Sequence, residues 1–110
     1  MNQKSLELLP GTLDTLILKA LQRGPLHGYA IMQTIRAHSN EVLSVGESTL
    51  YPALQRLLLN GWVKAEWGAS ENNRRARFYT LTTAGRKRLT AERADLETMI
   101  TAIRQVLETA

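Results

Sequence analysis

Residues 82–110 carry the longest helical pattern of the chain, and this pattern constrains the fold more than any other feature. Its apolar side chains recur at spacings close to a coiled-coil heptad, at Leu89, Leu96, Ile100, Ile103 and Leu107. At roughly 1.5 Å per residue such a helix is about 40 Å long, which is more than one domain of this size can cover. Part of the stripe therefore needs a partner, and we predict a homodimer; packing against the first helix of the same chain is the alternative.

A proline lies within the helical pattern of STLYPALQRLLLNGWV, residues 48–63. Proline removes a backbone donor, but the N–H groups of a first helical turn have no internal acceptor to lose. With Thr49 as the N-cap, Pro52 is the third helical residue and marks the start of a helix that runs to about residue 60. The predicted exposed side of this helix carries Ser48, Pro52, Gln55, Arg56 and Leu59.

The remaining segments predict two further helices and a β-hairpin. Residues 12–23, capped by Thr12, and residues 28–38, with His27 as the capping residue, have helical periodicity. The segments WVKAEW (62–67) and RARFYTL (75–81) alternate with a period of two, and the residues between them are rich in turn formers.

This order of elements predicts the fold class. Three helices, a hairpin and a long helix are typical of a winged helix-turn-helix, in which the hairpin is the wing. We therefore predict a mainly α fold with a small β-hairpin. Residues 1–81 would form a winged-helix DNA-binding domain and residues 82–110 a C-terminal dimerisation helix, together one compact unit.

Basic residues are concentrated in the second half of the chain. The formal net charge is +4, and six of the fourteen Lys and Arg residues lie between positions 71 and 88 with Glu71 as the only acid, namely Arg74, Arg75, Arg77, Arg86, Lys87 and Arg88. Such a local field attracts polyanions. In a winged helix the third helix enters the major groove, where Gln55 and Arg56 are side chains able to pair with base edges. Ser48 and Thr49, beside the free amides of the helix start, suit a phosphate. We predict that the partner is double-stranded DNA.

Three segments resemble the PadR family of bacterial transcriptional regulators: HGYAI (27–31), STLYPALQRLLLNGWV (48–63) and RRARFYTLTTAGR (74–86). The resemblance implies a winged-helix protein whose C-terminal helix forms a homodimer and which is usually a repressor. It implies a groove-entering segment at Ser48, Thr49 and Tyr51, and a wing at Arg74, Arg75 and Arg77. Leu59 departs from the pattern, because a polar or acidic residue is expected there.

Some PadR-like proteins stack flat ligands on a tryptophan of the dimerising helix, but this chain has no aromatic residue after Tyr79. A small-molecule effector, if there is one, would have to be recognised differently. We predict no cofactor.

Other classes of protein are disfavoured by the composition. The chain has no cysteine and two histidines, so we expect no metal site, and no nucleophile–base or phosphate-loop motif suggests an enzyme. The sequence has neither a secretory signal nor an apolar run of the roughly 18 residues that a membrane span needs, and we expect a cytoplasmic protein.

Several alternatives stay open on the sequence alone. The fold could be a protein-interaction module without DNA binding, with Leu59 in its docking surface. Tyr51 could cover the core, Gln55 and Arg56 could be ordinary solvated helix residues, and the arginines could form a solvated turn in which Arg77 pairs with Glu66.

Overall fold

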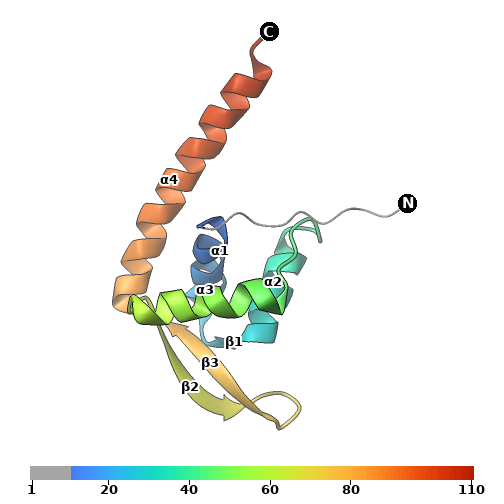
Figure 1. The fold of residues 1–110 in the computed structure, drawn as a ribbon, viewed down its shortest axis with the longest axis vertical. Coiled ribbons are helices and arrows are strands. Elements are labelled where there is room, and N and C mark those ends of the chain that lie inside the picture. The colour runs from blue at the N-terminus through green and yellow to red at the C-terminus, as the bar shows by residue number, and fades with distance from the viewer. Residues whose placement is uncertain (1–10) are drawn as a thin grey trace, which may run out of the picture.

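The computed structural model describes residues 11–110. Three helices and a small sheet form the body, and a fourth helix projects from it (Figure 1). The elements are α1 (Thr12–Ala20), η1 (Leu21–Arg23), β1 (Leu26–His27), α2 (Gly28–His38), α3 (Glu47–Leu59), β2 (Val63–Ala69), β3 (Arg75–Leu81) and α4 (Thr83–Glu108). The winged helix-turn-helix fold predicted from the order of segments is confirmed.

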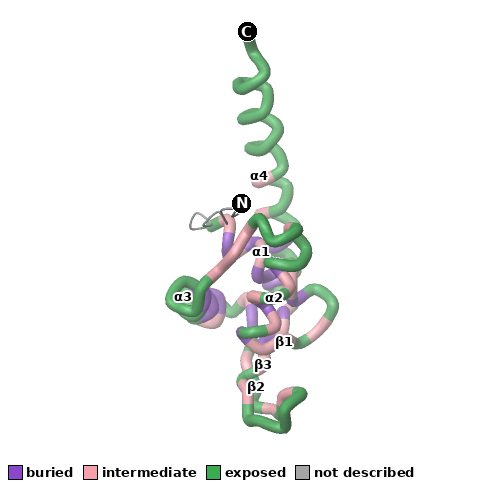
Figure 2. The backbone as a smooth tube through the Cα atoms, turned by 90° about the vertical axis from the view of Figure 1, so that its right-hand side faces the viewer, coloured by how far each residue is buried: buried purple, intermediate pink, exposed green. Residues whose placement is uncertain are grey.

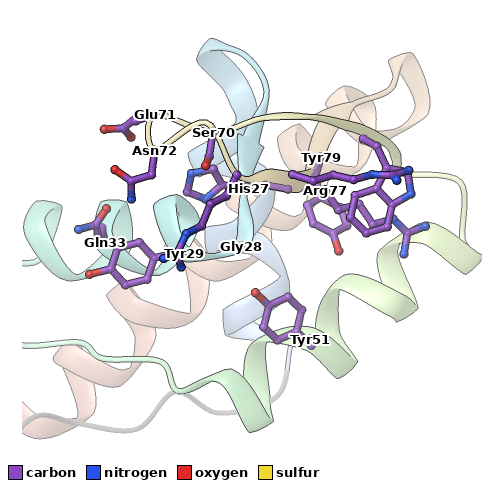
Figure 3. A pocket seen from close by; sticks show the side chains of 14 residues that line it. His27, Gly28, Tyr29, Gln33, Tyr51, Ser70, Glu71, Asn72, Arg77 and Tyr79 are labelled. Atoms are coloured by element: carbon purple, nitrogen blue, oxygen red, sulfur yellow. The ribbon is translucent and has the colours of Figure 1, made fainter.

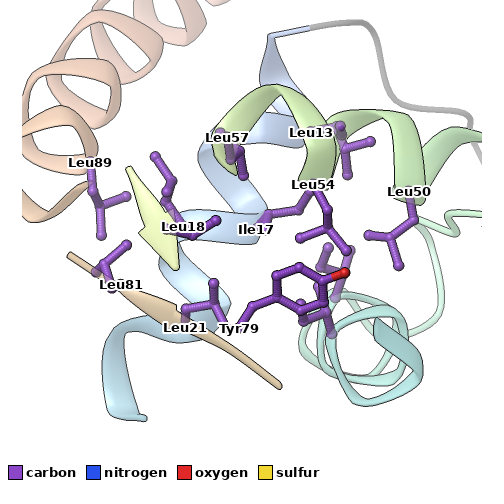
Figure 4. Packing of buried hydrophobic residues seen from close by; sticks show 14 residues of the cluster. Leu13, Ile17, Leu18, Leu21, Leu50, Leu54, Leu57, Tyr79, Leu81 and Leu89 are labelled. Atoms are coloured by element: carbon purple, nitrogen blue, oxygen red, sulfur yellow. The ribbon is translucent and has the colours of Figure 1, made fainter. Parts of the chain in front are cut away.

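The core lies where α1, α2 and α3 meet the sheet (Figure 4). The apolar stripes of the helices supply most of it, and Leu18, which lies outside the α1 stripe, is buried as well, so α1 is covered on two sides. The buried residues are Leu13, Ile17, Leu18, Leu21, Ile31, Ile35, Leu50, Ala53, Leu54, Leu57, Val63, Tyr79, Leu81 and Leu89.

The sheet has three antiparallel strands in the order β1-β3-β2, one more than the sequence predicted. The hairpin pairs Val63 with Leu81 at its base and Ala69 with Arg75 near its tip. β1 comprises only Leu26 and His27, too short for an alternating pattern, and it exists because β3 offers it an unpaired edge.

The start of α3 differs from the prediction. The N-cap is Gly46 and not Thr49, and the first helical hydrogen bond runs from the Leu50 N–H to the Gly46 carbonyl at 2.9 Å. Pro52 is consequently the sixth helical residue, so it does remove one internal bond, the one that would reach the Ser48 carbonyl. Ser48 is exposed, and water can hydrate the carbonyl that is left free.

The other helix starts follow the sequence more closely. The Nδ1 atom of His27 accepts a hydrogen bond from the Ala30 N–H at 3.2 Å, which confirms His27 as the cap of α2. α1 is capped by Gly11 at φ 90°, one residue before the predicted Thr12, and it ends at Ala20 before the 3₁₀ turn of η1.

α4 begins immediately after the hairpin, with Thr82 as the only residue between β3 and the helix. The Thr82 hydroxyl accepts the Gly85 N–H at 3.0 Å and donates to the Gly61 carbonyl at 2.7 Å, so it ties the helix to the base of β2. The first turns of α4 pack against α1, Glu92 and Leu96 are partly buried, and the helix from residue 97 onward leaves the body and is exposed (Figure 2).

Candidate nucleic-acid interface

An open hollow of about 640 Å³ lies between the wing, the start of α2 and α3 (Figure 3). The three wing arginines predicted to bind phosphate all line it, and so does Tyr51 of α3. The complete lining is His27, Gly28, Tyr29, Gln33, Tyr51, Trp67, Ser70, Glu71, Asn72, Arg74, Arg75, Ala76, Arg77 and Tyr79. The fold therefore brings together groups from three segments that are distant in the sequence.

The predicted contacts on α3 are distributed unequally around this hollow. Ser48, Thr49 and Gln55 are exposed, but of the α3 residues only Tyr51 lines the hollow itself. Glu47 occupies the first turn of the helix, and its carboxylate would repel a phosphate placed there. The phosphate site predicted at the amides of Ser48 and Thr49 is therefore disfavoured by the negative charge of Glu47. This residue belongs to α3 because the helix starts earlier than the sequence predicted.

Tyr51 lies directly against the backbone of α2. A Cβ atom added to Gly28 would lie 2.5 Å from the Tyr51 Oη, so only glycine permits this approach. Partial burial, with smaller contributions from Glu47 and Tyr79, raises the pKa of Tyr51 above its ordinary value. The hydroxyl therefore remains a proton donor, which suits contact with an anion.

Gly28→Ala should move the Tyr51 ring without unfolding the protein. The clash involves the far end of a side chain that is 45% exposed, and alanine is the better helix former by up to about 1 kcal/mol. We expect a melting temperature within a few degrees of the wild type and a loss of DNA affinity equal to that of Tyr51→Ala. Thermal unfolding and fluorescence anisotropy on a labelled duplex check the two parts. Wild-type affinity in Gly28→Ala would show that the position of Tyr51 is irrelevant to binding.

Arg56 is held by an ion pair that connects two helices. Its Nη2 atom lies 2.9 Å from the Asp14 Oδ1 of α1, and the two side chains are 49% and 23% exposed. Arg56 does not line the hollow. Asp14 compensates part of the Arg56 charge, so the attraction of Arg56 for a DNA phosphate is weakened, although its other N–H groups can still donate.

Two wing arginines lie over aromatic rings. The Arg75 Cζ is 4.6 Å from the centre of the Trp67 ring, and the Arg77 Cζ is 5.9 Å from that of Tyr79. The alternative pairing of Arg77 with Glu66 does not form, because Glu66 is opposite Phe78 in the hairpin and therefore lies on the other face.

Only four of the lining residues, Tyr51, Arg74, Arg75 and Arg77, were predicted as site residues from the sequence. Among the others, the sequence carried a signal for Tyr29, Gln33 and Trp67. Tyr29 and Gln33 are four apart on α2 and so share one side of that helix, and Trp67 pairs with Arg77 and therefore shares its face of the hairpin.

Comparison with known proteins decides the family. Residues 17–91 match the profile described as "Transcriptional regulator PadR-like family", which is more than half of the chain. The chain belongs to the PadR-like family.

Solved structures of transcriptional regulators agree with this assignment, and the chain is also similar to one curated protein. A transcriptional regulator from Clostridium thermocellum is 34% identical, with a TM-score of 0.78 over 86% of this chain and 92% of its own. A PadR family transcription regulator from Clostridium difficile is 26% identical, with a TM-score of 0.73 over 86% and 97%. A protein of Lysinibacillus sphaericus named "Uncharacterized protein X" is 28% identical over 105 residues, 93% of this chain and 96% of its own.

Membership of the PadR-like family makes this chain a transcriptional regulator and not an enzyme. In residues 11–110 no three His, Cys, Asp or Glu side chains gather in a way that could hold a metal ion. Over the same residues, no helix is both long and apolar enough to span a membrane.

The five residues predicted at the dimer interface of this PadR-like chain differ in burial. Leu89 is 5% exposed and belongs to the chain's own core, where α4 packs on α1, so it has almost no surface to offer a partner. Leu96 is partly buried, and the other three lie on the projecting part of α4, with exposures of 45% for Ile100, 52% for Ile103 and 78% for Leu107. Met99 and Val106 extend the same uncovered apolar surface.

Proposed function

We propose that this chain is a sequence-specific DNA-binding regulator, a repressor that binds an inverted-repeat operator as a homodimer. The observation that carries the proposal is the hollow that Arg74, Arg75 and Arg77 of the wing line together with Tyr51 of α3. Proteins contact DNA phosphates mainly through cationic, hydroxyl and N–H donors, and side chains on the exposed face of a helix can read base edges in the major groove. The wing supplies the cations, and Tyr51 and the exposed Gln55, four residues apart, share one side of α3.

Within this interface the wing would supply affinity and α3 specificity. The wing arginines are exposed, and a guanidinium binds phosphate through paired N–H donors without reading sequence. Gln55 is exposed on α3, and its amide matches the donor and acceptor of an adenine edge. Insertion of α3 into the major groove would bring both contacts to one half-site.

The uncovered stripe of α4 supports the homodimer. The side chains of Ile100, Ile103 and Leu107 are exposed to water in the single chain. Their apolar surface is removed from water only when another molecule covers it, and this burial is favourable. A second copy carries an identical stripe with near-heptad spacing, so the two helices can pair through the same residues. The dimer would place two α3 helices in successive major grooves, about 34–36 Å apart.

A salt series with two variants tests the DNA-binding proposal. The probe is a labelled duplex enriched from random-sequence DNA on the full-length protein. Arg75→Ala should weaken binding to enriched and random duplexes alike and lower the slope of log affinity against log salt by about 2, because the dimer loses one phosphate contact in each subunit. Gln55→Ala should lower the preference for the enriched sequence by roughly tenfold and leave the slope unchanged. The reverse pattern would mean that the roles of wing and helix are exchanged.

One observation favours a second function, a docking module for another protein. Leu59 is 78% exposed on α3, where a DNA-facing residue would be polar. If the selection enriches no duplex and the residual binding of DNA does not depend on salt, the result supports the protein-docking function and contradicts direct binding of DNA.

A further inference from the structure

Trp67 is an aromatic residue that the fold itself does not bury. It is 61% exposed in the middle of β2, within the wing, and it lines the hollow. The guanidinium of Arg75 lies over it, with the Cζ atom 4.6 Å from the ring centre. The ring thus serves as a support for a charged side chain and contributes little to the core.

The hairpin register makes this contact specific. Trp67 is paired with Arg77, and Ala69 with Arg75, so Arg75 is the diagonal neighbour of Trp67 on the same face of the hairpin. Alanine at position 69 leaves room for the guanidinium to lie across the indole. Residues 11–110 offer Arg75 no carboxylate within ion-pairing distance.

The group in contact with the Arg75 guanidinium determines whether this side chain can still bind a phosphate. A carboxylate would neutralise Arg75 and compete with any other anion. An aromatic face attracts the cation through its quadrupole and leaves the charge intact, and the N–H groups at the edge of the guanidinium plane stay free to donate. Stacking also restricts a side chain that would otherwise lose rotamer freedom on binding.

We propose that Trp67 is a positioning residue that orders Arg75 for a backbone phosphate of double-stranded DNA. The inference rests on the proposed DNA-binding function and adds to it the residue that prepares one phosphate contact. It implies that Trp67 acts through Arg75: without Arg75, the indole should contribute nothing further to affinity.

A double-mutant cycle on the full-length protein tests this coupling. The measurement is fluorescence anisotropy with the enriched duplex, on the wild type, Trp67→Ala, Arg75→Ala and the double variant. We expect Arg75→Ala to weaken binding about tenfold and Trp67→Ala about three- to tenfold. The double variant should bind like Arg75→Ala alone.

Two further readouts separate positioning from a general loss of structure. Trp67→Ala should keep the wild-type salt slope, because Arg75 is still charged and still reaches its phosphate, whereas Arg75→Ala lowers the slope. Trp67→Phe keeps an aromatic face and should restore most of the affinity. The matched control is Lys64→Ala, which removes an exposed cation from the other face of β2 and should change affinity less than twofold.

The outcomes distinguish this inference from the function on which it rests. If the wild type binds the duplex and Trp67→Ala binds equally well, the positioning role is wrong and the DNA-binding function stands. The role is equally wrong if Trp67→Ala weakens the Arg75→Ala protein by the same factor as the wild type. If the wild type binds no duplex, the proposed function fails and the positioning role fails with it.

Discussion

Ile103→Glu is expected to convert the protein to a monomer and to lower its affinity for an inverted-repeat duplex by at least about a hundredfold. Ile103 lies in the middle of the exposed part of the α4 stripe and is 52% exposed in the single chain. In a symmetric dimer each substitution occurs twice, so two carboxylates would lie in an apolar seam without partners. Sedimentation at micromolar concentration measures the mass, and anisotropy on the duplex measures the affinity.

Gln105→Glu is the matched control for this experiment. Residue 105 is exposed on the opposite side of α4 and acquires the same charge, so both the dimer and the affinity should be preserved. A wild-type protein that sediments as a single chain would contradict the proposed dimer. A dimeric Ile103→Glu protein would show that the two copies meet elsewhere.

Gly85→Ala is expected to destabilise the fold by about 3 kcal/mol or more, which lowers the melting temperature by at least about 10 °C. Gly85 is buried in the first turn of α4, and an added Cβ would clash with the Trp62 backbone carbonyl. This carbonyl also accepts the Thr82 N–H at 3.1 Å, so it cannot move without loosening the junction between hairpin and helix. Thermal unfolding at one fixed protein concentration measures the effect.

Gly46→Ala is the control variant, because it replaces a glycine by alanine at a helix start without a steric clash. Gly46 has φ −87°, and an added Cβ meets no atom within 4 Å. Its substitution should cost less than about 1 kcal/mol, mainly because alanine is a poorer N-cap than glycine. Equal losses of stability in Gly85→Ala and Gly46→Ala would mean that small structural shifts relieve the clash with the Trp62 carbonyl.

Elements with strong local signals were predictable from the sequence. α2 and β3 have the bounds that periodicity and alternation gave, and His27 is the expected cap. The predicted exposed side of α3 is exposed in the structure, including Leu59. In these segments the local preference and the tertiary packing favour the same conformation.

The features that the sequence did not predict depend on contacts between distant residues. β1 forms only because β3 is beside it, and Arg56 meets Asp14 across 42 positions of the chain. Leu89 continues the seam of α4 in sequence, but the packing of the first α4 turns on α1 buries it. The start of α3 was misplaced because a threonine is a good cap by type, whereas Gly46 is the residue whose backbone is extended there.

The single residue between β3 and α4 has a mechanical consequence. Because the Thr82 hydroxyl is hydrogen-bonded both to the Gly85 N–H of α4 and to the Gly61 carbonyl just before β2, we expect the wing and the projecting helix to move together. In the proposed dimer, a change in the crossing angle of the two α4 helices would then alter the separation of the two wings. A substitution or a ligand near the C-terminal end of α4 would therefore change the preferred spacing between the two half-sites, although it contacts no residue of the proposed DNA interface.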